Sequence, residues 1–174
     1  MSNYDEFRNR LEGNLSVFRH LLSELSEEEA VWKPGRDRWS VLETLCHLID
    51  IEVEDFRTDL KIVLFHPEEK WPSFDELGWV TERRYNEQDF AEKIVLFTEE
   101  REKSLRWLAR LENPDLELRH KGEGGGELKL RAGDVLASWV GHDLYHIRQL
   151  ALLRYDLMNR DEYKFSPQYS GFES

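Results

Sequence analysis

Hydrophobic residues recur along much of this chain at intervals of three and four positions, the spacing of a helix with one buried face. The first such segment runs from Tyr4 to about Leu25. The second begins at Ser40, which forms a capping-box signature with Glu43 three residues later, and it continues toward Phe65. We therefore expect two amphipathic helices in the first part of the chain.

The pattern then breaks at Pro67 and Pro72, and a long connection leads to about Asn86. This connection is rich in large aromatic side chains, including Trp71 and Trp79. Because so many aromatic side chains are unfavourable in water, we expect the connection to pack against the body of the protein.

A third helical pattern extends from Phe90 to Leu111 and is ended by Asn113 and Pro114. The glycine-rich segment that follows, residues 122–126, predicts a turn. Alternating residues at 127–131 are compatible with a short extended piece.

The fourth pattern is the longest, from about Ala132 to Met158, and the tail beginning at about residue 159 has few aliphatic residues and is expected to be irregular. Four amphipathic helices without a convincing strand pattern predict an all-α fold, a four-helix bundle with a long loop between its second and third helices. The length and the even composition indicate one domain over residues 1–174.

The composition indicates a cytoplasmic protein. The single cysteine, Cys46, cannot form an intramolecular disulfide, and the charged stretch from Met1 to Phe18 does not resemble a secretory signal. No run approaches the roughly 20 apolar residues that a membrane span requires.

The charge balance argues against two classes of partner. Asp and Glu number 36 against 24 Lys and Arg, so the formal net charge is −12. Such a mean field repels phosphate backbones and anionic membranes. We therefore expect neither nucleic acid nor a membrane as a partner.

Two histidines lie within the apolar stripe of the fourth helix. The stripe contains His142 and His146 at positions where a bundle normally has leucine. Residues four apart on a helix are neighbours, so both rings can reach one ion at about 2.0–2.1 Å. Buried imidazoles need either a metal or hydrogen-bond partners. A metal site and a hydrogen-bonded core pair both satisfy this requirement.

A third ligand is needed for an effective metal site, and His47 is a candidate. By helical angle it lies opposite Leu45 and Ile49, so it is not on the core face of its helix. It is either an ordinary surface residue or a ligand directed into a polar cleft between helices. The other histidines are interpreted as surface or loop residues: His20, His66 and His120.

Three stretches of the chain carry a resemblance to a known family. They are Trp39 to Glu43 continuing to His47 to Asp50 and Glu52, then Phe74 to Glu76 with Trp79 to Arg83, Tyr85, Asn86 and Arg101, and finally His142 to Gln149. Together they resemble the DinB-like (damage-inducible) superfamily of metal-binding four-helix bundles. That superfamily includes YfiT-type metal-dependent hydrolases and bacillithiol or mycothiol S-transferases. The similarity extends from Tyr4 to Leu157.

The resemblance implies a divalent metal held by His47, His142 and His146. Three imidazoles leave coordination positions open, as in catalytic metal sites. Zinc is the ion we expect first, with nickel, iron or manganese as alternatives, since imidazole binds several transition metals. In the thiol-transferase members the metal would hold a low-molecular-weight thiol as thiolate, ready to attack a small electrophile.

Three further residues have less specific roles. Arg101 either anchors an anionic substrate or pairs with a buried carboxylate. Asp143 either supports the metal ligands or is structural, and Cys46 is better explained as a small buried hydrophobe than as a nucleophile.

Two functional classes follow from the sequence. One is a metal-dependent thiol S-transferase or hydrolase acting on a small-molecule substrate, and the other is a non-catalytic metal- or ligand-binding stress-response protein. A bundle without metal is a third alternative. The family resemblance and the six tryptophans also suggest a homodimer.

Overall fold

The computed structural model describes residues 2–73, 75–124, 129–159, 165 and 168–171. Its long helices are α1 (Asn3–Leu22), α3 (Val41–Asp50), α4 (Arg57–Phe65), α6 (Phe90–Ala109) and α7 (Ala132–Met158). Its short elements are α2 (Glu27–Val31), the π-helix η1 (Ile51–Phe56), α5 (Glu76–Glu82), and the 3-10 helices η2 (Tyr85–Glu87) and η3 (Gln168–Ser170).

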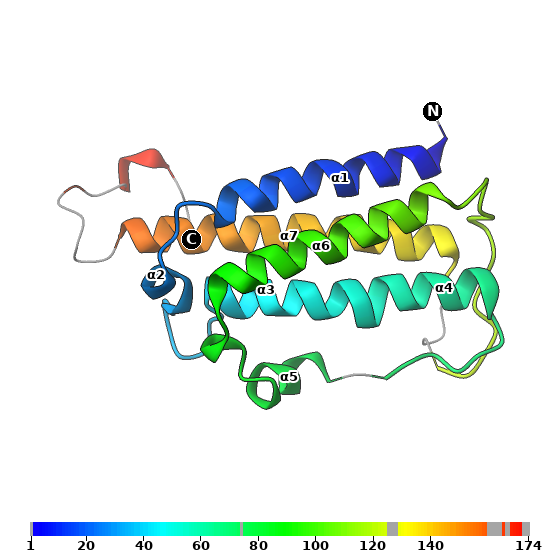
Figure 1. Cartoon of the computed structure of the whole chain (residues 1–174), viewed down its shortest axis with the longest axis horizontal. Helices are drawn as coiled ribbons and strands as arrows, with labels where there is room; N and C mark the ends of the chain where they lie inside the picture. The colour runs from blue at the N-terminus through cyan, green and yellow to red at the C-terminus, as the bar shows by residue number, and fades with distance from the viewer. Residues whose placement is uncertain (1, 74, 125–128, 160–164, 166–167, 172–174) are drawn as a thin grey trace.

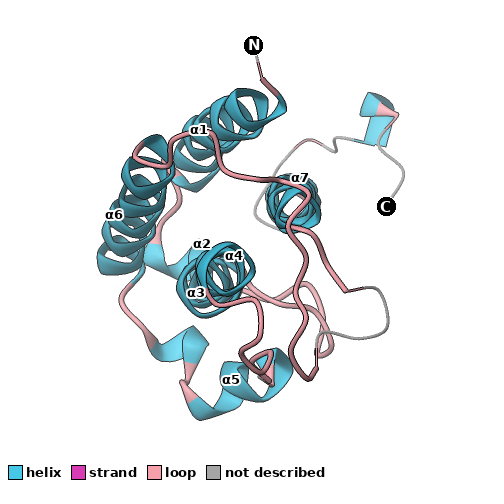
Figure 2. Ribbon diagram, turned by 90° about the vertical axis from the view of Figure 1, so that its right-hand side faces the viewer, coloured by secondary structure: helices cyan, strands magenta, loops and turns pink. Residues whose placement is uncertain are grey.

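The predicted four-helix bundle is confirmed. The segments α3, η1 and α4 form one continuous rod, which lies alongside α1, α6 and α7 (Figure 1). Viewed along the bundle, α1, α6, the α3–α4 rod and α7 surround a common core, and α5 lies outside the rod (Figure 2). Within the described residues the only extended pairing is an isolated bridge between Arg119 and Arg131. The predicted extended piece at 127–131 falls partly outside the described residues.

The ends of the helices follow local sequence signals. The Ser40 hydroxyl accepts a hydrogen bond from the Glu43 amide at 3.0 Å, and the Glu43 carboxylate accepts one from the Ser40 amide at 2.9 Å, so the predicted capping box is present. Helix α1 ends at Leu22, before the predicted Leu25, because the next residue, Ser23, has an extended backbone, and Glu24 then adopts a left-handed conformation with φ 68°. Helix α6 ends at Ala109, two residues before the predicted Leu111.

The π-helix η1 interrupts what the sequence predicts as one regular helix. The Thr58 hydroxyl donates a 2.8 Å hydrogen bond to the Val53 carbonyl, five residues earlier. A π turn changes which residues face inward, and such turns occur frequently at functional sites. Here Glu52 and Phe56 both lie in the core, with exposed fractions of 1% and 8%.

The long connection between α4 and α6 packs against the body of the protein, as predicted. Trp79 and Tyr85 are buried, whereas Phe74 lies outside the described residues. His120, expected at the surface, is also buried, and its Nε2 lies 2.7 Å from the Glu69 carbonyl. The expectation was wrong because the segments at 67–71 and 120–123 pair through their backbones and cover the ring.

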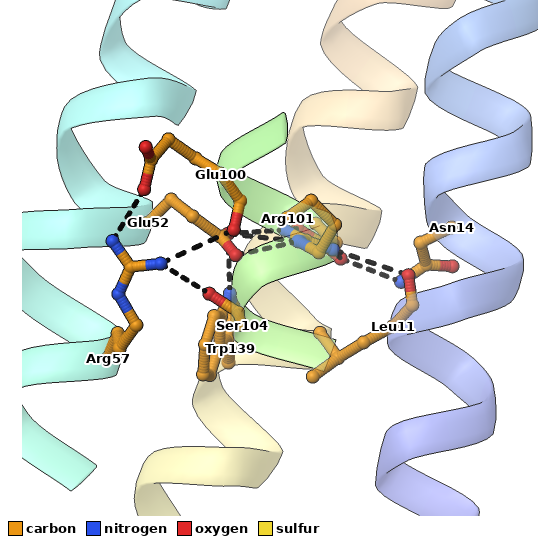
Figure 3. Close-up of polar contacts among 9 residues, drawn as sticks. Leu11, Asn14, Glu52, Arg57, Glu100, Arg101, Ser104 and Trp139 are labelled. Carbon is orange, nitrogen blue, oxygen red and sulfur yellow. Dashed lines mark hydrogen bonds and ion pairs between the residues drawn. The ribbon is translucent and has the colours of Figure 1, made fainter. Parts of the chain in front are cut away.

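A buried ionic network joins the four long elements of the bundle (Figure 3). Arg101 on α6 donates from Nε to both oxygens of Glu52 at 3.0 and 2.9 Å. Its Nη1 and Nη2 donate to Asp143 of α7 at 2.6 and 2.7 Å. Asn14 of α1 and Trp139 of α7 donate to Asp143 and Glu52 at 3.1 Å each. Every element of the bundle therefore contributes a group to one network.

None of the described helices is both long and apolar enough to span a membrane.

We expect Arg101→Met to lower the free energy of unfolding by about 3–5 kcal/mol, because it leaves two buried carboxylates without their cation. Urea denaturation followed by circular dichroism would measure the loss. Arg106→Met on the same helix is the control, since Arg106 forms an exposed pair with Glu102 that should contribute about 1 kcal/mol or less. Equal effects of the two substitutions would show that the network does not hold the bundle together.

Asp59, a buried acid outside this network, gives the fold a pH dependence. Burial, together with a hydrogen bond and the charge of Asp55, raises the pKa of Asp59 to about 9. The Asp59 side chain is 4% exposed, and its Oδ1 has no hydrogen-bond partner among the described residues. A folded-state pKa above the ordinary value of 3.8 means that the native state prefers the protonated acid. The contribution of the protonated Asp59 to the stability of the native state is therefore complete below about pH 4, and it is lost as the pH rises toward 9.

We therefore expect Asp59→Asn to be more stable than the wild type at pH 7 to 8, by about 1–3 kcal/mol, and the difference to vanish near pH 4. Thermal unfolding across this pH range would test it. The exposed Asp37→Asn should show no such trend. A wild type that is the more stable of the two at pH 8 would contradict the assignment.

Candidate metal centre

The three histidines expected from the resemblance lie together. His142 and His146 occupy successive turns of α7, and His47 faces them from α3. The Nε2 atom of His142 lies 3.2 Å from that of His47 and 3.1 Å from that of His146. The possible ligand atoms of all three residues lie within 4.8 Å of one another.

His47 is buried, with an exposed fraction of 2%, so the surface alternative for this residue is contradicted. From its helical angle alone, His47 was expected to lie away from the core. That inference was wrong because other parts of the protein pack against more than one side of α3. The Trp39 ring packs edge-on against His47 at a centroid distance of 5.0 Å. Helices α2 and α5 also contact α3. Every residue from Val41 to Ile49 is buried as a result.

The three rings are neutral at physiological pH. Burial, together with the neighbouring His146, lowers the pKa of His47 and of His142 to about 3. Burial also lowers the pKa of His146. A neutral imidazole carries one lone pair and one N–H, and the lone pair is what a metal requires.

Gln149 orients one of the rings. Its Oε1 lies 2.7 Å from Nδ1 of His146, so the ring proton resides on Nδ1 and donates to the amide oxygen. The lone pair of His146 is therefore on Nε2, the atom that faces His142. Hydrogen bonding alone cannot satisfy the cluster, because a single N–H at the His142 Nε2 cannot donate fully to both neighbours.

The separations fit a shared ion. For nitrogens about 2.1 Å from one metal, the distance between two ligand atoms is about 3.0 Å at right angles and about 3.4 Å at the tetrahedral angle. The observed 3.1 and 3.2 Å lie between these values. The donor set of three neutral imidazoles suits zinc and several other transition metals.

The triad lies in the wall of a pocket of about 640 Å³, a volume typical of small-molecule sites. Leu77 and Tyr145 in its wall are 69% and 62% exposed, so the pocket opens to solvent. The remaining lining residues are Asp37, Arg38, Trp39, Glu76, Arg148, Gln149, Leu152 and Asp156. A small molecule entering this pocket would meet the exposed edge of the triad.

Three residues considered from the sequence lie away from this pocket. Arg101 and Asp143 are buried at 1% and 0% exposure and bind each other, which favours the pairing of Arg101 over its anchoring of a substrate. Cys46 is 3% exposed, and burial raises its pKa to about 12. A thiol with that pKa is a poor nucleophile, as expected for a small buried hydrophobe.

Sequence reasoning assigned no role to two residues of the site. Gln149 follows His146 by three positions, a spacing that places it on the same side of α7 and could have identified it as a hydrogen-bond partner. Trp39 immediately precedes the Ser40 cap, and no local pattern indicates that its ring contacts His47.

Comparisons with known proteins agree with this geometry. The structure is similar to that of YfiT from Bacillus subtilis, described as a probable metal-dependent hydrolase with an unusual four-helix bundle topology. The TM-score is 0.74 at 16% sequence identity, over 92% of this chain and 89% of that chain. No curated protein matches in sequence. The family model of the DinB superfamily matches residues 10–150, and the chain therefore belongs to the DinB superfamily.

Proposed function

We propose that the protein binds one divalent ion, zinc first, through His47, His142 and His146, and that it is a metal-dependent thiol S-transferase or hydrolase acting on a small electrophile. The observation that carries the proposal is the convergence of three neutral imidazoles, through Nε2, in the wall of a solvent-accessible pocket. A closed structural site would bury its fourth position instead.

Each group near the site has a separate task in this proposal. The triad would hold the ion, and Gln149 keeps the His146 lone pair directed toward it. When bound, the ion supplies Lewis acidity, which lowers the pKa of a thiol or of water. The described residues that line the pocket include no cysteine, serine or lysine, so the nucleophile would enter with the co-substrate or from solvent.

The family supports this class of chemistry without identifying the reaction. YfiT, which shares the fold, is described as a probable metal-dependent hydrolase. A non-catalytic metal- or ligand-binding protein is the alternative, and the open pocket beside the triad favours the enzyme.

The activity can be tested with monochlorobimane, whose chloride is displaced when a thiolate sulfur attacks the adjacent carbon. Zinc-loaded protein should accelerate formation of the fluorescent thioether from mercaptoethanol or mercaptopropionate, and metal-free protein should not. If no metal-dependent conjugation occurs, ester hydrolysis under the same conditions distinguishes the hydrolase. Failure of both assays would favour the binding protein.

We expect the purified protein to bind close to one divalent ion per chain, and the alanine substitutions His47→Ala, His142→Ala and His146→Ala each to abolish tight binding. Two imidazoles form a poor chelate for zinc. Mass spectrometry of tag-free protein would measure stoichiometry. In wild type, excess ion at a hundred times the dissociation constant should stabilise the fold by about 2.7 kcal/mol.

The matched control is His66→Ala, because His66 is exposed and lies outside the triad. It should retain full stoichiometry and the metal-dependent rise in melting temperature. A His47→Ala protein that also retains both would remove His47 from the site.

We also expect Gln149→Leu to weaken metal binding by about 10- to 100-fold, because the His146 ring loses the acceptor that fixes its tautomer. Gln149→Glu should retain or strengthen binding, since a carboxylate accepts the same hydrogen bond. Competition with a chromophoric chelator would give the affinities. If leucine and glutamate at this position bind the ion equally well, the hydrogen bond does not orient the ligand.

A further inference from the structure

Among the described residues, the pocket beside the triad contains one cationic side chain without a counter-ion. Two arginines line it, and Arg38 donates to Asp156 at 3.2 Å. Arg148 is exposed and has no ion pair or hydrogen bond from its guanidinium within the described part of the chain. The other charged residues of the lining are the exposed carboxylates Asp37 and Glu76.

The missing counter-ion matters because of where Arg148 lies. Acidic residues exceed basic ones by 36 to 24, and most other described arginines pair with carboxylates, as Arg57 does with Glu100 at 2.6 Å. Arg36 and Arg110 also have no such partner within the described residues, but they lie outside this pocket. Arginine presents a planar fork of donors that matches a carboxylate. Its position in the wall of an open pocket makes that fork available to a bound molecule.

The placement of Arg148 on α7 defines how a ligand would lie. It follows His146 by two residues and flanks the stripe formed by Tyr145 and Leu152, which also line the pocket. A molecule with one end at the triad and the other at Arg148 would cross this apolar stripe. Its carbon body would contact the tyrosine ring and the leucine side chain.

We propose that Arg148 binds a carboxylate of the molecule held in the pocket, so that the co-substrate is a small thiol bearing one carboxylate. This rests on the proposed thiol chemistry at the triad. Arg38 is already neutralised by Asp156, and Asp37 and Glu76 would repel further negative charge. One carboxylate therefore fits the pocket better than a phosphate or a polyanion.

The test uses two thiols of similar size on the full-length protein loaded with cobalt, whose thiolate complexes absorb light by charge transfer. Mercaptopropionate carries a carboxylate, and mercaptoethanol carries a hydroxyl in its place. Because Arg148 is exposed, we expect Arg148→Gln to weaken mercaptopropionate binding by about fivefold at low salt. Mercaptoethanol binding should not change. High salt should reduce the difference between the two proteins.

Arg110→Gln is the matched control, because Arg110 is likewise exposed and its guanidinium forms no ion pair or hydrogen bond with any described residue, but it lies outside the pocket. It should leave both affinities unchanged. If Arg148→Gln weakens both thiols equally, or neither, the carboxylate assignment is overturned while the thiol chemistry stands.

A second measurement separates this inference from the proposed function. If neither thiol produces a charge-transfer band in wild type, the thiol chemistry fails, and propionate is then titrated into the zinc-loaded protein. A propionate-dependent shift of the Arg148 guanidinium resonance that is absent from the Arg110 resonance would retain Arg148 as a carboxylate site. No shift would overturn it.

Discussion

The bidentate pairing of Arg101 with Asp143, together with its bond to Glu52, fixes the distance between the two halves of the histidine triad. Glu52 is on the same rod as His47, and Asp143 adjoins His142 on α7. A guanidinium is rigid and planar, so the two carboxylates that it binds cannot separate without losing charge-assisted hydrogen bonds. Because this network is buried, a lost partner would leave an uncompensated charge. The relative position of α3 and α7 is therefore strongly constrained.

The same network also supplies an electrostatic bias. Its two carboxylates outnumber its one guanidinium, which leaves a net charge of one negative unit beside three neutral rings. Burial lowers the pKa of His146, while the hydrogen bond to Gln149 and the charge of Asp143 act in the opposite direction. An interior that carries negative charge and offers neutral lone pairs favours a cation, and it does so without placing a carboxylate among the ligands. The network thus contributes to both the geometry and the charge of the site.

The long helices could be predicted from the sequence because they depend on the periodicity of apolar residues. Short helices and the burial of single residues could not, because they depend on packing between distant parts of the chain. Four long helices follow from repeated apolar spacing, and α7 has the predicted bounds. The five residues of α2 and the seven of α5 are too few to show a period, although the Ser26 capping box marks α2. The π-helix η1 could not be predicted from the pattern of apolar residues, because one of its core positions is occupied by Glu52, a charged residue.

The site was predictable to a similar degree. The spacing of His142 and His146 within an apolar stripe identified one half, and only the family resemblance added His47, since helical angle placed it away from the core. What buries His47 is contributed by Trp39 and by helices distant in sequence. The sequence also could not decide whether Arg101 pairs with a buried carboxylate or anchors a substrate. Both roles place an arginine in the apolar stripe of its helix, so the pattern is the same for each.

On helix α7 the residues that face the core, the histidines of the triad and the residues that line the pocket lie on separate stripes of the surface. With about 100° between successive residues, Trp139, Asp143 and Leu150 form one stripe that faces the core. His142, His146 and Gln149 form the next, and Tyr145, Leu152 and Asp156 form a third along the pocket, with Arg148 at its outer edge. Substitutions in the third stripe can alter what the pocket binds while the other two stripes retain their contacts. A helix arranged in this way allows the binding preference of the pocket to change without loss of the fold or of the histidine triad.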